Sequence, residues 1–286
     1  MRTTTAASGR VWFITGAGRG LGRAFTRAAL DNGDRVVAAT RTVAPLEGMA
    51  AGHEDRLLVL PLDVTDRAAV HAAVDRATER FGRLDVVVNN AGIMSMGMIE
   101  EFTEAEARAQ METNFFGALW VSQAVLPCLR AQGAGHIVQI SSIGALGGFP
   151  TTGLYSASKF ALEGMSEALA MEAARFGVKV TIVEPGGYWT DLYTSMTATT
   201  PIPGYAPLRA ELEKQWAEGS VDSDPRLAAE AVLTLVGGDE PPLRLLLGGT
   251  AYDLAFDVSR RRMETWARWE EVSRAAEHAI PAPPAR

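Results

Sequence analysis

The stretch Thr15-Gly16-Ala17-Gly18-Arg19-Gly20-Leu21-Gly22 follows directly on a short apolar run, and a helical pattern then extends to Asn32-Gly33. Glycine permits a positive φ in a tight turn and lets a phosphate approach the amides at the start of a helix. The spacing is T-G-x-x-x-G-x-G, which differs from the G-x-G-x-x-G of the usual dinucleotide fingerprint. A strand, a glycine turn and a helix in this order predict a site for a nucleotide phosphate. The alternative is a purely structural glycine-rich turn.

The rest of the chain repeats the alternation of a short apolar strand and a helix. Further strands are predicted at 34–40, 56–62, 84–89, 136–141, 178–184 and 243–247, and helices at 66–81, 103–130, 152–176, 225–236 and 251–277. Thr103 and Glu106 form a capping box at the start of one helix, which Pro127 is expected to kink or end. This alternation predicts an α/β fold, a doubly wound parallel sheet of Rossmann type with helices on both faces.

A single domain is expected over residues 10–278, because no linker-like boundary interrupts the pattern. Residues 1–9 and 279–286 are expected to be flexible tails. The segment 187–222 breaks the alternation and is rich in glycine, proline, threonine and aromatic residues, which predicts a substrate lid or a pair of small helices.

The composition of the 286-residue chain, with a net charge of -7 and 47% hydrophobic residues, is ordinary for a globular enzyme. Its basic residues form no dense cluster beyond Arg260-Arg261-Arg262, so nucleic-acid binding has little support. The single cysteine, Cys128, is expected to be a buried structural thiol, and the scattered histidines give no metal site. Because the sequence has neither a signal-peptide pattern nor a membrane-spanning run, we expect a cytoplasmic protein with no membrane partner.

Tyr155 and Lys159 lie four residues apart near the start of the helical run 152–176, and so on one face of a helix. An ammonium group beside a phenol favours the phenolate, so the pKa of Tyr155 is expected to fall below its usual value. Such a tyrosine could exchange protons near neutral pH. Taken alone the spacing is weak evidence, since a surface tyrosine packed on a lysine stem gives the same pattern.

Five motifs together resemble, in order and spacing, those of the short-chain dehydrogenase/reductase family. They are Thr15-Gly16-x-x-x-Gly20-x-Gly22, Asn89-Asn90-Ala91-Gly92, Ser142, Tyr155-x-x-x-Lys159 and Pro185-Gly186. The resemblance covers residues 9 to 192 and continues to about residue 275. It implies the Rossmann-type fold and hydride transfer to or from a nicotinamide.

The resemblance implies a catalytic set made of Asn114, Ser142, Tyr155 and Lys159. Tyr155 would exchange a proton with the substrate oxygen, and Lys159 would hold the nicotinamide ribose and lower the pKa of the tyrosine. The family serine lies thirteen residues before the tyrosine, which selects Ser142 over Ser141. Asn114 would support a water that leads to the lysine; the alternative is an interior helix asparagine bonded to the backbone.

The resemblance also implies a dinucleotide cofactor. Members that prefer NAD carry an acidic residue at the end of the second strand, a position occupied here by Thr40 and followed by Arg41. Arg19 and Arg41 would suit the 2′-phosphate of NADP(H), unless they point to solvent. NADP(H) is therefore expected in preference to NAD(H). The expected cofactor residues are Gly16, Gly18, Arg19, Gly20, Leu21, Gly22, Thr40, Arg41, Asp63, Val64, Asn90, Ala91, Gly92, Tyr155, Lys159, Pro185, Gly186 and Thr190.

The expected substrate pocket is apolar and is formed by Met94, Phe149, Tyr188, Trp189 and Tyr193, although these residues could instead pack the lid on the body. An apolar pocket favours a lipophilic ketone, aldehyde or secondary alcohol. The sequence thus predicts an NADP(H)-dependent carbonyl reductase or alcohol dehydrogenase. The rival functions are an epimerase or dehydratase that retains its nucleotide and a non-catalytic regulator that binds NADPH. The family resemblance also implies a homo-oligomer, a dimer or tetramer, often formed through helices 103–130 and 152–176.

Overall fold

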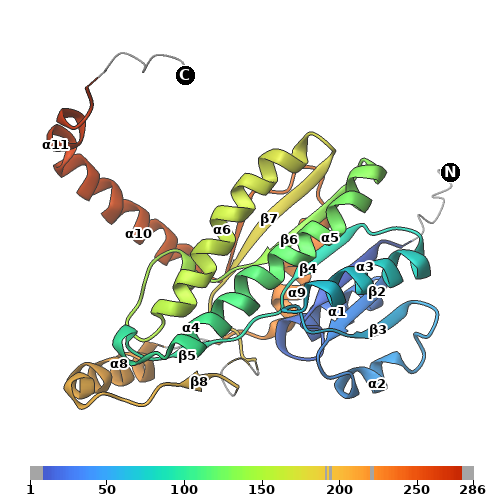
Figure 1. The fold of residues 1–286 in the computed structure, drawn as a ribbon, viewed down its shortest axis with the longest axis horizontal. Coiled ribbons are helices and arrows are strands. Elements are labelled where there is room, and N and C mark those ends of the chain that lie inside the picture. The colour runs from blue at the N-terminus through green and yellow to red at the C-terminus, as the bar shows by residue number, and fades with distance from the viewer. Residues whose placement is uncertain (1–8, 191, 193–194, 220–221, 279–286) are drawn as a thin grey trace, which may run out of the picture.

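The computed structural model describes residues 9–190, 192, 195–219 and 222–278, and a seven-stranded sheet forms its centre (Figure 1). The strands run in the order β3-β2-β1-β4-β6-β7-β9, and each neighbouring pair is parallel. Their bounds are Val11–Thr15 for β1, Arg35–Thr40 for β2, Leu57–Pro61 for β3, Val86–Asn89 for β4, Gly135–Ile140 for β6, Val178–Pro185 for β7 and Arg244–Leu247 for β9. The predicted doubly wound α/β fold is confirmed.

Helices cover both faces of this sheet. Helices α1 (Gly20–Asp31), α2 (Ala44–Ala50) and α9 (Pro225–Gly237) pack on one face, and α3 (Arg67–Phe81), α5 (Gly117–Gln132) and α6 (Gly153–Ala174) on the other. Successive side chains of a strand point to opposite faces, so β1 supplies both cores. Trp12 and Ile14 join the core under α1, whereas Val11 and Phe13 join the core under α3 and α5.

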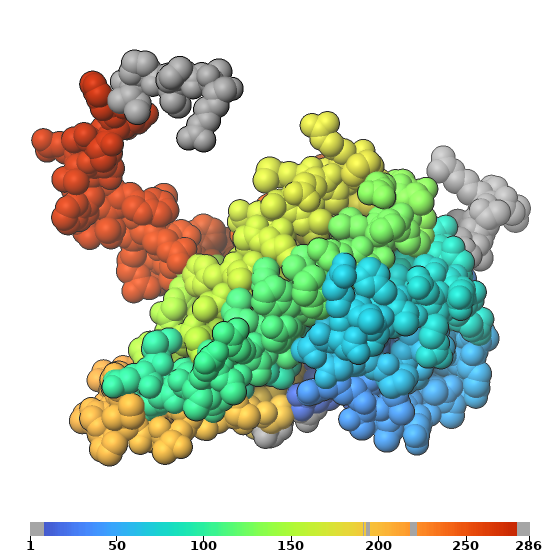
Figure 2. All heavy atoms as spheres, viewed as in Figure 1, coloured from blue at the N-terminus to red at the C-terminus, as the bar shows by residue number. Residues whose placement is uncertain are grey.

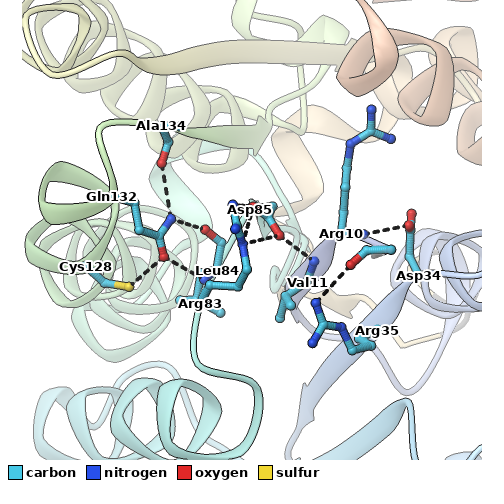
Figure 3. A network of polar contacts seen from close by, with 11 residues as sticks. Arg10, Val11, Asp34, Arg35, Arg83, Leu84, Asp85, Cys128, Gln132 and Ala134 are labelled. Carbon is cyan, nitrogen blue, oxygen red and sulfur yellow. Dashed lines mark hydrogen bonds and ion pairs between the residues drawn. The ribbon is translucent and has the colours of Figure 1, made fainter. Parts of the chain in front are cut away.

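Polar side chains satisfy the backbone at the amino ends of the strands (Figure 3). Asp34 accepts a hydrogen bond from the amide of Arg10 at 2.9 Å, and Asp85 accepts one from the amide of Val11 at 2.8 Å. Gln132 bonds both the amide and the carbonyl of Leu84, and the Cys128 thiol donates to Gln132 at 3.2 Å. Cys128 is only partly buried, so the expectation of a buried thiol is wrong.

The helical run that opens at Thr103 differs from its prediction. Its capping box with Glu106 is confirmed, but the helix divides into α4 (Glu104–Met111), a π-helical segment (Glu112–Phe116) and α5. Pro127 does not end α5, which continues to Gln132 and stops at Gly133 with a φ of 68°. The proline lies on the exposed side of the helix, where water can reach the carbonyl that loses its amide partner.

The segment predicted as a lid contains the short strand β8 (Thr197–Ala198), a 3-10 turn (Pro203–Tyr205) and helix α8 (Ala206–Gly219). Strand β8 pairs in parallel with β5 (Ser95–Met96). The segment is thereby attached to a part of the body that lies about 100 residues earlier in the chain. The carboxylate of Glu101 accepts hydrogen bonds from Thr199 Oγ1 at 2.7 Å and the amide of Ile202 at 2.9 Å, and it pairs with Arg209.

Two C-terminal helices, α10 (Gly249–Arg268) and α11 (Glu270–Ala275), form an arm that extends away from the body (Figures 1 and 2). One side of α10 is attached to the body as far along the helix as Arg262, since Ala251 is buried and Arg262 donates to the carbonyl of Leu146 at 2.7 Å. Among the helices that the structure describes, none is both long and apolar enough to cross a bilayer.

Candidate active site

A cavity of about 1020 Å³ opens at the carboxyl ends of the central strands. It lies where the order of the sheet reverses between β1 and β4, the place where doubly wound folds bind their ligands. Every cofactor residue expected from the sequence lines this cavity except Gly22. The same cavity reaches Ser142, Tyr155 and Lys159, so the expected nucleotide and catalytic residues share one continuous space.

The glycine turn joins β1 to α1 at the floor of the cavity. Gly16 and Gly20 adopt φ values of 63° and 49°, which favour glycine. The side-chain amide of Asn90 donates to the carbonyls of Thr15 at 3.0 Å and Gly16 at 3.3 Å, and so holds the turn against the end of β4. A Cβ on Gly22 would lie 2.3 Å from the carbonyl oxygen of Gly16, so the role of Gly22 is to allow close packing inside the turn.

The geometry of this turn fits a dinucleotide. A Cβ on Gly18 would come 2.7 Å from Thr40 Oγ1, so a side chain there would fill the space between the turn and the end of β2. Arg19 and Arg41 both border the cavity and are otherwise exposed, which leaves two guanidinium groups available at this end. Backbone amides at the start of α1 and these two arginines provide donors for phosphate groups.

Tyr155 and Ser142 both line the cavity. Tyr155 is buried in the first turn of α6, and its ring packs over Gly144, where a Cβ would lie 3.2 Å from a ring carbon. Ser142 hydrogen-bonds the tyrosine side chain and accepts a bond from the amide of Gly144 at 3.0 Å. Two hydroxyl groups therefore face the same part of the cavity.

Lys159 lies one turn after Tyr155 on α6. Its ammonium group donates to the carbonyl of Ile140 at 2.8 Å and lies 5.7 Å from the centre of the Tyr155 ring. Burial lowers the pKa of Lys159 to about 8, while the carboxylate of Glu163 acts in the opposite direction. Lys159 is therefore predominantly charged at neutral pH, and its attachment to β6 fixes it beside the tyrosine.

The pKa of Tyr155 differs from the prediction. Burial raises this pKa above its ordinary value, and the hydrogen bond with Ser142 opposes the rise without reversing it. The expectation that the neighbouring ammonium lowers the pKa was wrong, because the loss of water around the phenolate outweighs other influences on the enclosed side chain. The protonated phenol is thus the stable form at neutral pH, which suits a proton donor.

Asn114 lies behind the cavity wall, in the π-helical segment. Its amide oxygen accepts from the backbone amide of Ile93 at 2.9 Å, and its nitrogen donates to the carbonyl of Ile93 and to Ser158 Oγ, each at 3.0 Å. Ser158 in turn donates to the carbonyl of Tyr155 at 2.7 Å. Asn114 thus joins the loop after β4 to the helix that carries Tyr155. These contacts match the backbone-bonded alternative raised for this residue.

Ser141, the neighbour of Ser142, belongs to a buried cluster of charged groups behind the cavity. Its hydroxyl donates to Glu163 at 2.6 Å, and Arg244 lies 3.3 Å from Glu163 and 3.2 Å from Glu184. Arg244 also pairs with the half-exposed Glu167. Burial and the adjacent Glu163 carboxylate raise the pKa of Glu184 to about 7, while Arg244 acts in the opposite direction. The cluster connects β6, β7, β9 and α6 directly beneath the cavity.

The expected substrate residues divide into three groups. Met94, Phe149 and Tyr188 line the cavity, whereas Tyr193 lies outside the described residues. Trp189 does not line the cavity: it is 71% exposed and faces a smaller surface hollow beside α1. Tyr188 pairs with Ser223 in an extended segment, so its neighbour Trp189 points to the opposite side.

Several cavity residues were not predicted individually. Leu212, Gln215 and Trp216 come from α8, and Thr250 and Leu254 come from the base of α10. The α8 residues fall within the segment predicted as a lid, but their helical spacing gave no separate sign of a pocket. No sequence signal linked α10 to the site, because its contact with the cavity depends on the strand order of the sheet.

Comparisons with known proteins agree with this geometry. A model of the short chain dehydrogenase family matches residues 10–201. The oxidoreductase BOA17 of Botryotinia fuckeliana is 41% identical over 271 residues, which are 93% of this chain and 99% of that protein. A 3-ketodihydrosphingosine reductase of Bacteroides thetaiotaomicron is 37% identical over 246 residues, which are 84% of this chain and 88% of that protein.

Solved structures show the same fold. A short-chain dehydrogenase from Streptomyces avermitilis shares 38% identity with a TM-score of 0.87, and the match covers 94% of this chain and 100% of that one. An alcohol dehydrogenase from Thermococcus sibiricus, complexed with 5-hydroxy-NADP, shares 27% identity with a TM-score of 0.71 over 83% of this chain and 95% of that one. Other matching structures contain NADP or NADH.

Proposed function

The chain belongs to the short-chain dehydrogenase family and is an oxidoreductase that uses a nicotinamide cofactor, and we propose that it transfers a hydride between NADP(H) and a lipophilic carbonyl compound or its secondary alcohol. The observation that carries this proposal is the position of Tyr155 and Ser142. Their hydroxyl groups face the cavity between its nucleotide-binding end and its apolar end.

When bound, the cofactor supplies or accepts the hydride, and the protein must handle the proton and the charge on the substrate oxygen. Tyr155 would donate a proton to that oxygen during reduction and remove it during oxidation. Ser142 would hydrogen-bond the same oxygen as negative charge develops on it. Lys159 would place a positive charge beside the tyrosine and hold the ribose, while Asn114 would position the backbone around both.

The preference for NADP(H) is supported by the charges at the end of β2. Thr40 offers no carboxylate to repel a 2′-phosphate, and its hydroxyl donates to the carbonyl of Thr42 at 3.3 Å. Arg41 and Arg19 border the same cavity as Thr40. Guanidinium groups bind phosphate through paired hydrogen bonds, whereas the diol of NAD would leave them without an anionic partner.

The lipophilic substrate class is supported by the wall of the cavity beyond Tyr155. Its side chains there are mainly apolar and come from the loop after β4, the loop after β6, the lid and α10; they include Met94, Ile143, Phe149, Met196, Trp216 and Leu254. Such a wall binds hydrocarbon better than phosphate or carboxylate groups. The similarity to a 3-ketodihydrosphingosine reductase, whose name describes a long-chain ketone, is in accord with this class.

The decisive experiment follows oxidation of NADPH with a panel of aliphatic and aromatic ketones and aldehydes. Tyr155→Phe should lower kcat by about 10²- to 10⁴-fold because it removes the proton donor, while NADPH affinity stays close to that of the wild type. Net oxidation of NADPH in bulk would argue against an epimerase or a regulator. Turnover of Tyr155→Phe at the wild-type rate would refute the proposed mechanism.

The cofactor proposal has its own experiment. Arg41→Asp introduces a carboxylate where the 2′-phosphate would bind, so the ratio of kcat/KM for NADPH to that for NADH should fall at least tenfold. Arg35→Gln serves as the control, because Arg35 begins β2, whereas Arg41 follows the end of that strand; the Arg35 side chain bonds the carbonyl of Gly9. A ratio that does not change in Arg41→Asp would contradict the preference for NADP(H).

A further inference from the structure

The C-terminal arm carries a stripe of large apolar side chains that no described part of the chain covers. Six of them are more than half exposed: Tyr252, Phe256, Met263, Trp266, Trp269 and Val272. Tyr252, Phe256, Met263 and Trp266 recur at intervals of four, seven and three residues, which places them along one side of α10. A continuous apolar surface of this kind marks a site of association.

This stripe differs from the side of α10 that faces the body. Ala251, Leu254 and Val258 are buried or partly buried, and Arg262 lies 6.0 Å from the centre of the Phe160 ring. These four residues follow the helical repeat on a separate side from Tyr252 and Met263. Packing on the body therefore leaves the apolar stripe free, and Figure 2 shows the arm standing clear of the other elements.

The charges along α10 are divided between its two halves. The first half, residues 249–259, carries Asp253 and Asp257 and no basic side chain. The second half, residues 260–268, carries four arginines and one glutamate. An antiparallel pair of these helices would bring the acidic half of each against the basic half of the other, whereas a parallel pair would bring like charges together.

We propose that α10 is an interface between two copies of this chain, in which the two arms pack antiparallel through the apolar stripe. A self-complementary surface of this type generates a closed two-fold dimer. The stripe provides aromatic and methionine side chains, which are enriched at the centres of such interfaces. The inference concerns assembly and holds whatever substrate the enzyme uses.

The first test measures the mass of the full-length chain by sedimentation and light scattering at micromolar concentrations. Met263→Glu combined with Trp266→Glu should halve the mass of the wild-type particle, because each of the two helices would have to bury two carboxylates in the interface. Leu227→Glu is the matched control, since Leu227 is also more than half exposed but lies on α9. A monomeric wild type, or a double variant with the wild-type mass, would overturn the proposal.

A second test depends on charge and preserves the apolar stripe. One variant, Asp253→Arg with Asp257→Arg, makes both halves of α10 predominantly basic. Another, Arg260→Glu with Arg261→Glu and Arg268→Glu, makes both halves predominantly acidic. Each alone should have half the wild-type mass, and an equimolar mixture should recover the full mass as a mixed pair. Far-ultraviolet circular dichroism checks that each variant is folded. Failure of the mixture to associate, with both variants folded, would refute the antiparallel arrangement.

The same variants distinguish a second copy from a lipid surface. Vesicles of phosphatidylcholine and phosphatidylglycerol serve as the probe, because aromatic and arginine side chains on one helix are also found in peripheral membrane proteins. Under our proposal the wild-type chain remains in the supernatant when the vesicles are sedimented. The proposal would be overturned if the wild type sedimented with the vesicles, if Met263→Glu with Trp266→Glu no longer did so, and if that double variant had the same particle mass as the wild type.

Discussion

Replacement of Glu184 by glutamine should stabilise the folded chain above neutral pH and have a much smaller effect in mild acid. Glu184 is fully buried at the end of β7, next to Glu163 and 3.2 Å from Arg244. Its pKa is raised from 4.5 to about 7, chiefly by burial and then by the neighbouring carboxylate. Glutamine has the shape of the protonated acid and places an uncharged amide beside Glu163 and Arg244.

The sign of the effect follows from proton linkage. A carboxyl whose pKa is raised by folding binds more protons in the folded chain than in the unfolded chain, so the free energy of unfolding falls as pH rises from 4.5 to about 7. Each pKa unit corresponds to about 1.4 kcal/mol, which gives about 3 kcal/mol over this interval. The glutamine variant avoids this penalty.

The measurement is urea unfolding of the full chain, followed by tryptophan fluorescence at about pH 5 and about pH 8.5. Glu184→Gln should gain about 3 kcal/mol at the higher pH and much less at the lower pH. Glu167→Gln is the matched control, because Glu167 contacts the same arginine but is half exposed. A variant less stable than the wild type at the higher pH, or equally stabilised at both values, would show that folding does not raise the pKa of Glu184.

Three further predictions concern the lysine, the lid and helix α5. Because burial lowers the pKa of Lys159 to about 8, kcat/KM for carbonyl reduction should fall above that pH as the ammonium loses its proton, and a level pH profile through this region would contradict the assignment. Glu101→Gln should raise the substrate KM several-fold with little change in NADPH affinity, because the carboxylate bonds Thr199, Ile202 and Arg209 of the lid. The bonded Glu101 has a pKa of about 2, so the contribution of this contact to stability is complete above the ordinary pKa of 4.5 and is lost only as pH falls towards 2. Pro127→Ala should raise stability by about 1–2 kcal/mol in thermal unfolding, because an interior helix proline costs about 3 kcal/mol and its stiffening of the unfolded chain offsets only part of that.

The strands were the most predictable part of the fold. The central strands β1 and β4 are buried on both faces, so each has a continuous apolar run in the sequence, such as Val11 to Ile14. The spacing of Tyr155 and Lys159 was equally accessible, because both lie on one helix and their separation is local. The structure brings Ser142 to the same tyrosine because β6 ends beside the start of α6.

Other features depend on contacts between distant parts of the chain. The pKa of Tyr155 rises because the surrounding elements exclude water, a quantity that its sequence neighbours do not determine. Glu101 meets Arg209 across more than 100 residues, and Leu254 reaches the cavity from the last long helix. The prediction that Trp189 lines the pocket is wrong. The segment is extended because Tyr188 pairs with Ser223, and the local sequence does not reveal that pairing or which side chains it turns away from the cavity.

The π-helical segment Glu112–Phe116 makes this part of the chain intolerant of a change in length. Each residue of an α-helix advances the direction of the side chains by about 100°, so the wider turn shifts α4 relative to α5 by one residue. Deletion of a single residue here would turn Asn114 away from Ile93 or rotate the apolar side of α5 off the sheet. Sequence insertions and deletions should therefore be rare between 112 and 116 in related chains, whereas the segment around 187–222 should vary freely in length as substrates diverge.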